Sequence, residues 1–458
     1  MNQTDLVIRG RRVITENAVG PASVHISLGR IIAIAGFDEV PSDSEIVEAD
    51  EDSIVMPGLV DTHVHVNEPG RTDWEGFETA TRAAAAGGVT TIVDMPLNSI
   101  PSTTTFDALK SKLESTRGQL HVDVGFWGGV VPGNTSELAN LWNAGVVGFK
   151  CFLVHSGVDE FPNVTECDLR GAMPELARLG ATLIVHAELP GPIEAGCGPS
   201  STDNAGSRSY ETFLRSRPRE AENEAVELMI RLSRETGCTV HIVHHSSADA
   251  LVMLRQARMS DARITAETCP HYLHFAAEDI PAGATEFKCC PPIRERENRE
   301  QLWEALRGGI IDMVVSDHSP CPPEMKLPEQ GDFMKAWGGI SSLQLRLALI
   351  WTEAMARGFM INQLAEWLCA APARLVSLEE RKGTIAIGRD ADIVIWNPTK
   401  AFRVEPGMIH HRHKLTPYAG QRLHGVVEKT FLRGQIVYDG AEFSDAKGEL
   451  LLRPFSSF

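Results

Sequence analysis

The sequence predicts an α/β fold in which eight strand-and-helix units close into a (β/α)8 TIM barrel, beside a small β-sandwich domain. The first observation is that short apolar segments alternate with helix-like segments through most of the 458 residues. The second is that polar residues follow several apolar segments, at the strand ends where barrel active sites form. The third is that both chain ends have a different pattern from the middle.

Eight apolar segments have the length and the β-branched content of buried strands. Stretches rich in Ala, Leu, Glu and Arg lie between them at residues 74–86, 217–236 and 298–307, and each is followed by Gly, as in helices with glycine C-caps. We therefore expect residues 57–380 to form the barrel. The eight segments are IVMPGLVDTHVH, TTIVDMP, VDVGFWGG, GVVGFKCF, TLIVHAE, VHIVHHSS, RITAETCPHYL and DMVVSDHSP.

The chain ends show β-branched alternation and glycine turns instead. The segments are LVIRGRRVI and SVHISLGRIIAIA near the N-terminus, and DADIVIWNP and GVVEKTFLRGQIVYDG near the C-terminus. We expect residues 1–56 and 381–458 to pair into one β-sandwich domain, so that the barrel is an insertion between its two halves.

The composition excludes several classes of function. A net charge of -18 disfavours nucleic-acid binding, because phosphate contacts need a basic surface. The chain contains no stretch of about 20 apolar residues, which a membrane-spanning helix requires, and its first residues lack a signal-peptide pattern. Nine cysteines without a C-x-x-C pair favour reduced thiols. We expect a cytoplasmic protein without nucleic-acid or membrane partners.

Two histidines end the first apolar segment. His63 and His65 are two residues apart on a strand, so their side chains point to the same face and can bind one metal ion. A His-x-His pair alone is more often a pair of packing or surface histidines than a pair of metal ligands. The expected position of this pair at the mouth of a barrel favours the interpretation that the two histidines bind a metal ion.

Lys150 ends the apolar segment GVVGFK, where an unpaired ammonium group would lose its hydration. A neutral amine there can react with carbon dioxide, and the two oxygens of the resulting carbamate can bridge two cations. The alternative is a lysine that snorkels to solvent or pairs with a carboxylate, and the sequence alone leaves it open.

Three further candidates follow other strands. His186 in IVHAE and His244 in IVHHSS offer nitrogen ligands for a second metal, although each could be a hydrogen-bonded core histidine. Asp317 in VVSDHSP could bind the first metal and accept a proton, or could be a turn or helix-cap aspartate. Because all six candidates end predicted strands on one face, we expect a site for two divalent metal ions.

The motifs in combination resemble the cyclic-amide-hydrolysing branch of the amidohydrolase superfamily, and most closely its allantoinases. The likeness runs from about residue 5 to residue 440. It is carried by PGLVDTHVHVNEPGR, GFKCF, VHAE, VHHSS, AETCPHYL, CCPPIRE, VSDHSPC and KGTIAIGRDADIVIWNP. The resemblance implies zinc as the metal and a homotetramer as the assembly. It assigns His63 and His65 to the first metal, carboxylated Lys150 to the bridge, His186 and His244 to the second metal, and Asp317 to both metal binding and proton transfer.

The same resemblance bears on the substrate. Dihydroorotases have an arginine for the substrate carboxylate where this chain has Asn67, which favours an uncharged ring. Dihydropyrimidinases and hydantoinases have an oxyanion-binding tyrosine where this chain has His155. Cys290 replaces a serine in a loop whose backbone would grip the ring. His155 and Asn98 are candidates for oxyanion or ureido contacts.

The implied reaction is opening of the hydantoin ring of allantoin to give allantoate, by a hydroxide held between two metals. One alternative is a hydantoinase or dihydropyrimidinase that acts on simpler rings. The other is a non-catalytic scaffold of the same fold. The scaffold is disfavoured because all six candidate ligands are present.

Overall fold

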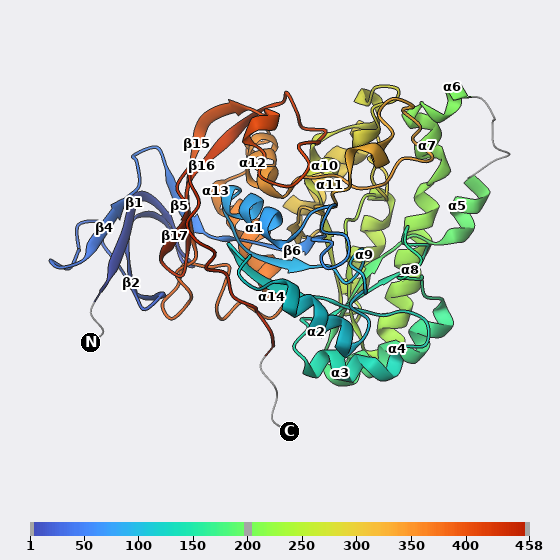
Figure 1. Ribbon diagram of the computed structural model, residues 1–458, viewed down its shortest axis with the longest axis horizontal. Helices are drawn as coiled ribbons and strands as arrows, with labels where there is room; N and C mark the ends of the chain where they lie inside the picture. Colours follow the sequence, from blue (N-terminus) through green and yellow to red (C-terminus); the bar gives the residue numbers. More distant parts are fainter. Residues whose placement is uncertain (1–3, 197–203, 454–458) are drawn as a thin grey trace.

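The computed structural model describes residues 4–196 and 204–453, which form a barrel and a β-sheet beside it (Figure 1). Residues 1–3 and 454–458, which belong to the expected small domain, lie outside the described residues. None of the helices in the described ranges is both long and apolar enough to cross a membrane.

The barrel strands pair only in parallel. They form two runs of hydrogen-bonded neighbours, β6-β7-β8 and β9 to β14. A parallel bridge between Val64 and His318 links one end of these runs, and the Val147 N–H, just before β10, donates to the carbonyl of Phe126 in β8 at the other. The strands coincide with the eight predicted segments, which confirms the barrel. They are β6 (Leu59–Val64), β7 (Val89–Asp94), β8 (Asp123–Phe126), β9 (Gly128–Gly129), β10 (Phe149–Phe152), β11 (Thr182–His186), β12 (Thr239–Ile242), β13 (Ile264–Thr268) and β14 (Met313–Val314).

Helices cover the outside of the barrel (Figure 1). The three predicted helical stretches form α1 (Phe77–Ala86), α8 (Arg219–Thr236) and α11 (Arg296–Arg307). The C-cap residue of α8 is Gly237, whose φ of 73° lies in the left-handed region that favours glycine. The other α-helices are α2 (Phe106–Ser115), α3 (Leu138–Asn143), α4 (Glu166–Leu179), α5 (Pro190–Gly196), α6 (Asn204–Ser207), α7 (Tyr210–Ser216), α9 (Leu251–Arg258), α10 (Pro270–His274), α12 (Arg346–Ala356), α13 (Ile361–Ala365) and α14 (Ala371–Leu375).

The two chain ends pair, as the sequence predicts, and their strands form one eight-stranded sheet. Its order is β17-β16-β15-β5-β1-β2-β3, and β4 also pairs with β1. Figure 1 shows the blue N-terminal strands beside the red C-terminal strands at the left. The antiparallel pairing of β5 with β15 joins the two ends. The strands are β1 (Leu6–Ile14), β2 (Val19–Ser27), β3 (Arg30–Ala35), β4 (Glu45–Glu48), β5 (Ile54–Pro57), β15 (Ile393–Arg403), β16 (Arg422–Leu432) and β17 (Gln435–Tyr438).

A buried ion cluster connects this sheet to the barrel. The Lys382 Nζ lies 2.6 Å from Asp123 at the start of β8, 3.0 Å from Asp390 and 2.6 Å from Asp392. Arg433, between β16 and β17, also contacts Asp123 at 2.6 Å. Burial raises the pKa of Asp392, whereas at Asp390 the attraction of Lys382 outweighs burial and holds the pKa below its ordinary value. The cluster therefore couples the two parts through charge.

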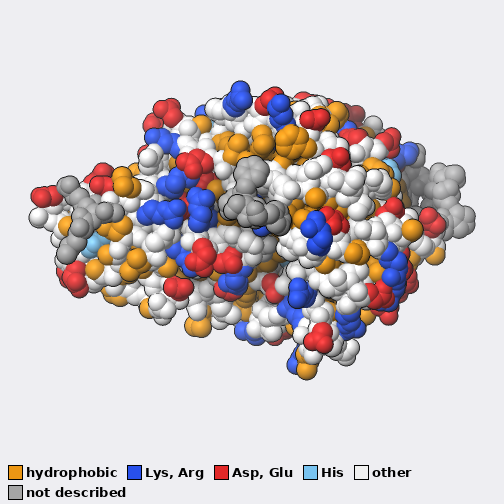
Figure 2. Space-filling view, turned by 90° about the horizontal axis from the view of Figure 1, so that it is seen from below, with side chains coloured by type: hydrophobic (Ala, Val, Ile, Leu, Met, Phe, Trp, Pro, Cys, Tyr) orange, Lys and Arg blue, Asp and Glu red, His pale blue; other side chains and the backbone are white. Residues whose placement is uncertain are grey.

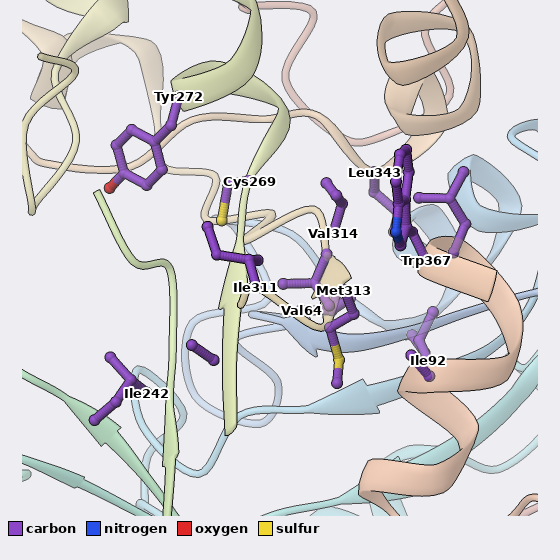
Figure 3. Packing of buried hydrophobic residues seen from close by; sticks show 14 of the residues in the cluster. Val64, Ile92, Ile242, Cys269, Tyr272, Ile311, Met313, Val314, Leu343 and Trp367 are labelled. Atoms are coloured by element: carbon purple, nitrogen blue, oxygen red, sulfur yellow. The ribbon is translucent and has the colours of Figure 1, made fainter. Parts of the chain in front are cut away.

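The apolar core lies within the barrel and under its helices. Figure 3 shows Val64, Met313 and Val314, from strands at the seam of the barrel, close together beside Leu343 and Trp367. On the surface, Figure 2 shows acidic, basic and apolar side chains mixed over one face. The packed interior leaves the strand ends as the place where polar groups can converge.

Candidate metal centre

The six candidate ligands line one cavity of about 490 Å³. They come from five strands, as the sequence predicts. His63 lies in β6 and His65 directly follows it, Lys150 lies in β10, and His186 is the last residue of β11. The other two, His244 and Asp317, lie just beyond the ends of β12 and β14.

Three of these side chains bring their donor atoms together. The Nε2 of His63 lies 3.1 Å from the Oδ1 of Asp317, and the Nε2 of His65 lies 3.8 Å from the same oxygen. Their potential ligand atoms all lie within 4.8 Å of one another, and all three residues are buried. Two nitrogens and one carboxylate at this spacing are a ligand set that suits a divalent transition metal.

The electrostatic field at His63 also favours a cation. Burial alone would lower its pKa, but Asp317 and Glu267 together raise the pKa of His63 to about 9. Two carboxylates thus stabilise positive charge at this imidazole. A metal ion bound to the ring would occupy the same favourable field.

Two more histidines lie beside this group. The ring centroids of His186 and His244 are 4.6 Å apart, and those of His63 and His244 are 5.4 Å apart. Burial lowers the pKa of both His186 and His244, so both rings are neutral and can act as ligands. His245 does not line the cavity, and the charges that act on its ring are those of Glu222 and Arg294. The structure therefore brings His244 to the site, as predicted.

Lys150 lines the same cavity as both groups of ligands and has an unusual environment for a lysine. Its side chain is fully buried, and its Nζ has no hydrogen-bond partner within the described part of the chain. The ring of Phe152 lies 4.9 Å from the Nζ. Burial lowers the pKa of Lys150 to about 8, although Asp317 and Glu267 oppose the shift. Neither snorkelling nor an ion pair accounts for this residue, and a buried amine without a partner fits carboxylation.

Two carboxylates that the sequence analysis missed orient the histidines. Glu267 accepts from the Nδ1 of His63 at 2.6 Å, and Glu188 contacts the Nε2 of His186 at 2.7 Å. Glu188 is held in turn by Arg217, which contacts it at 2.6 Å. Such contacts fix the ring orientation of metal-binding histidines. The only signal in the sequence was an acidic residue at the end of an apolar segment, in RITAET and IVHAE.

The predicted substrate contacts are only partly brought together. Asn98 lines the cavity, and its Nδ2 lies 3.3 Å from the Nδ1 of His65. Cys290 and His155 also line the cavity, but the His155 side chain is 60% exposed and lies 3.5 Å from Asp159. Asn67 is buried outside the cavity lining, where its Nδ2 donates to the Pro320 carbonyl at 3.4 Å.

Comparison with known proteins places this geometry in a family. Residues 54–437 match the amidohydrolase family model. The allantoinase of Streptomyces avermitilis is 49% identical, covering 99% of this chain and 100% of that protein. The allantoinase of Saccharomyces cerevisiae is 45% identical, covering 95% of each.

A solved structure agrees with the fold. The L-hydantoinase (dihydropyrimidinase) from Arthrobacter aurescens superposes with a TM-score of 0.91 at 30% identity, covering 98% of this chain and 100% of that one. The chain therefore belongs to the amidohydrolase family of metal-dependent enzymes and, within it, to the allantoinases.

Proposed function

We propose that the protein hydrolyses the hydantoin ring of allantoin to give allantoate, a step of purine degradation. The observation that carries this proposal is the 49% identity to an allantoinase over nearly the whole of both chains. The hydantoinase of closely similar structure is only 30% identical. The larger identity to allantoinases favours allantoin over simpler cyclic amides.

Two metal ions, with zinc as our proposal, would be held by the six residues that line the cavity. We assign His63, His65 and Asp317 to one ion, His186 and His244 to the other, and a carboxylated Lys150 to the bridge. The convergence of three donors within 4.8 Å supports the first set. The buried Nζ without a partner among the described residues supports the carbamate.

The ions would lower the pKa of water towards neutrality and polarise the ring carbonyl. The chain supplies the proton transfer: a carboxylate oxygen of Asp317 accepts a proton during attack and returns it to the departing ring nitrogen. Asn98 and His155 are our candidates for contacts to the oxyanion or the ureido group. The loop of Cys290 would hold the ring through its backbone. Asn67, which does not line the cavity, would support the substrate site through its hydrogen bond to the Pro320 carbonyl.

The test is turnover of a substrate panel by purified protein whose bound metal has been quantified. Allantoin should be hydrolysed with a larger kcat/KM than hydantoin or dihydrouracil. Preference for either simpler ring would identify a hydantoinase or dihydropyrimidinase instead. Full metal content without turnover of any ring would favour a non-catalytic scaffold.

Three further assignments rest on the family resemblance and the strand order. We propose a homotetramer in the cytoplasm, for which sedimentation should give four times the mass of the chain. We also propose domain boundaries near residues 56/57 and 380/381. β5 ends at Pro57 and only Gly58 separates it from the start of β6 at Leu59, which supports the first boundary.

A further inference from the structure

One wall of the cavity is formed by a segment with almost no regular secondary structure. Ala336, Trp337, Gly338 and Gly339 line the cavity, and residues 334–339 lie outside every helix and strand. A wall of this kind cannot be positioned by a β-ladder or a helix. Its position must depend on other contacts.

Lys326 supplies the first of these contacts. Its side chain is buried, and its Nζ donates to the carbonyl oxygens of Lys288 at 3.1 Å, Trp337 at 2.9 Å and Gly339. An ammonium group has three N–H donors, so all of them are used on main-chain carbonyls. Two of the three carbonyls belong to the cavity wall.

Lys288 supplies the second contact from the other end of the segment. Its Nζ donates to the carbonyl oxygens of Met334 at 3.1 Å and Ala336 at 2.5 Å, and the ring of Phe213 lies 5.2 Å away. This side chain is also buried. The two lysines together hold four of the six carbonyls in residues 334–339.

Neither ammonium group has an acidic partner within ion-pair distance among the residues that the structure describes. Burying a charge without a counter-ion costs more than burying an apolar side chain of the same length. The hydrogen bonds to the wall are what offset this cost here. Because a methionine could fill the same space, the specific contribution of each lysine is to fix the carbonyls.

The wall also leaves no room for side chains at its two glycines. A Cβ atom at Gly338 would stand 3.2 Å from the Sγ of Cys290, and one at Gly339 would stand 2.3 Å from the carbonyl oxygen of Ser319. The next residue, Ile340, accepts from the Ser319 N–H at 3.0 Å, beside the strand end that carries Asp317. The wall is thus packed against Cys290 and against Ser319, which follows Asp317 by two residues.

We propose that Lys326 and Lys288 are positioning residues that hold residues 334–339 against the ring of the substrate and thereby set its affinity. The proposal rests on the proposed function for the identity of the substrate. Both side chains act through the main chain, and the wall contacts the ring in the ground state and the transition state alike. Loosening the wall therefore raises KM more than it lowers kcat.

The experiment compares Lys326→Met and Lys288→Met with the wild type, and uses Lys110→Met, which removes an exposed lysine of α2, as the matched control. Steady-state kinetics with allantoin should show KM raised about tenfold or more in each buried variant, because hydrogen bonds to a charged group are lost. The change in kcat should be smaller, and bound metal should stay unchanged. The control should behave as the wild type.

Hydrogen exchange of the amides in residues 334–339 gives a second measurement. In the wild type the Trp337 and Gly339 amides should exchange slowly, since they donate to Met325 and Lys288 at 2.9 Å. Their exchange should be about tenfold faster or more in both buried variants.

Wild-type exchange of these amides as fast as in an exposed loop would overturn the proposal, even if a variant failed to fold. Unchanged KM and unchanged exchange in Lys326→Met or Lys288→Met would overturn it as well. If the wild type did not hydrolyse allantoin, the proposed function would fail, while the exchange data would still decide the positioning role.

Discussion

Replacing Lys382 with methionine should destabilise the protein far more than any exposed lysine would. Its Nζ lies within 3.0 Å of three carboxylates, and its side chain is fully buried. Arg433 still contacts Asp123, and Arg381 still contacts Asp390 at 2.9 Å, but Asp392 has no other ion pair in the described chain. Breaking a buried pair by removing one partner costs about 3–5 kcal/mol, and we expect a loss of unfolding free energy in this range at pH 7.

The loss should depend on pH in a defined direction. The pKa of Lys382 is raised in the folded protein, so its stabilising contribution is fully present at pH 7 and is lost only in strongly alkaline solution. Without this ammonium the pKa of Asp392, which burial already raises, should rise further above its unfolded value of about 4. The folded variant then binds more protons than the unfolded chain as the pH falls. The difference from the wild type should therefore shrink between pH 7 and pH 5.

Urea denaturation at both pH values, followed by tryptophan fluorescence, measures these differences. Lys400→Met is the matched control, because Lys400 lies on the same sheet but pairs with Glu428 while its side chain is 54% exposed. That exposed pair should contribute about 1 kcal/mol or less. A loss in Lys382→Met no larger than in Lys400→Met, or one that grows towards pH 5, would refute the reasoning.

Three other predictions concern the metal centre. Lys150→Ala should lower kcat about a thousandfold or more, since the bridge between the ions is lost. Adding a short carboxylic acid should restore part of the lost turnover. Undiminished turnover without the acid would contradict the bridging role. Glu267→Gln should weaken metal retention about 10- to 100-fold in competition with a chelator, because His63 loses its partner, and unaltered retention would contradict that role. Dialysis against a chelator should abolish turnover and added zinc should restore it, whereas full activity in protein shown to be metal-free would contradict metal dependence.

The barrel could be predicted because each buried strand is apolar along its own length, which is visible in the sequence. Parallel strands are covered on both faces, so they appear as apolar runs that a helix must separate. Two segments form two strands each: IVMPGLVDTHVH forms β5 of the terminal sheet and β6 of the barrel, and VDVGFWGG forms β8 and β9. Trp127 lies between β8 and β9, and its buried Nε1 donates to the Thr62 carbonyl of β6 at 2.9 Å.

The cavity could be predicted because its candidate metal ligands lie at the ends of barrel strands. Their convergence follows from the barrel, which brings all strand ends to one rim. Glu267 was missed because its contact with His63 spans 204 residues and leaves no local pattern. Lys326 was missed for a related reason: its partners are main-chain carbonyls, whose positions depend on the loop conformation rather than on residue type.

The pairing of β5 with β15 has a consequence for synthesis of the chain on the ribosome. About 340 residues separate these neighbouring strands, so the N-terminal strands emerge long before their C-terminal partners exist. At a translation rate of about 5–20 residues per second, roughly 20 to 70 s pass between the synthesis of β5 and that of β15. During that interval the edge is open to pairing with other nascent chains, and the sheet can close only after translation has nearly finished.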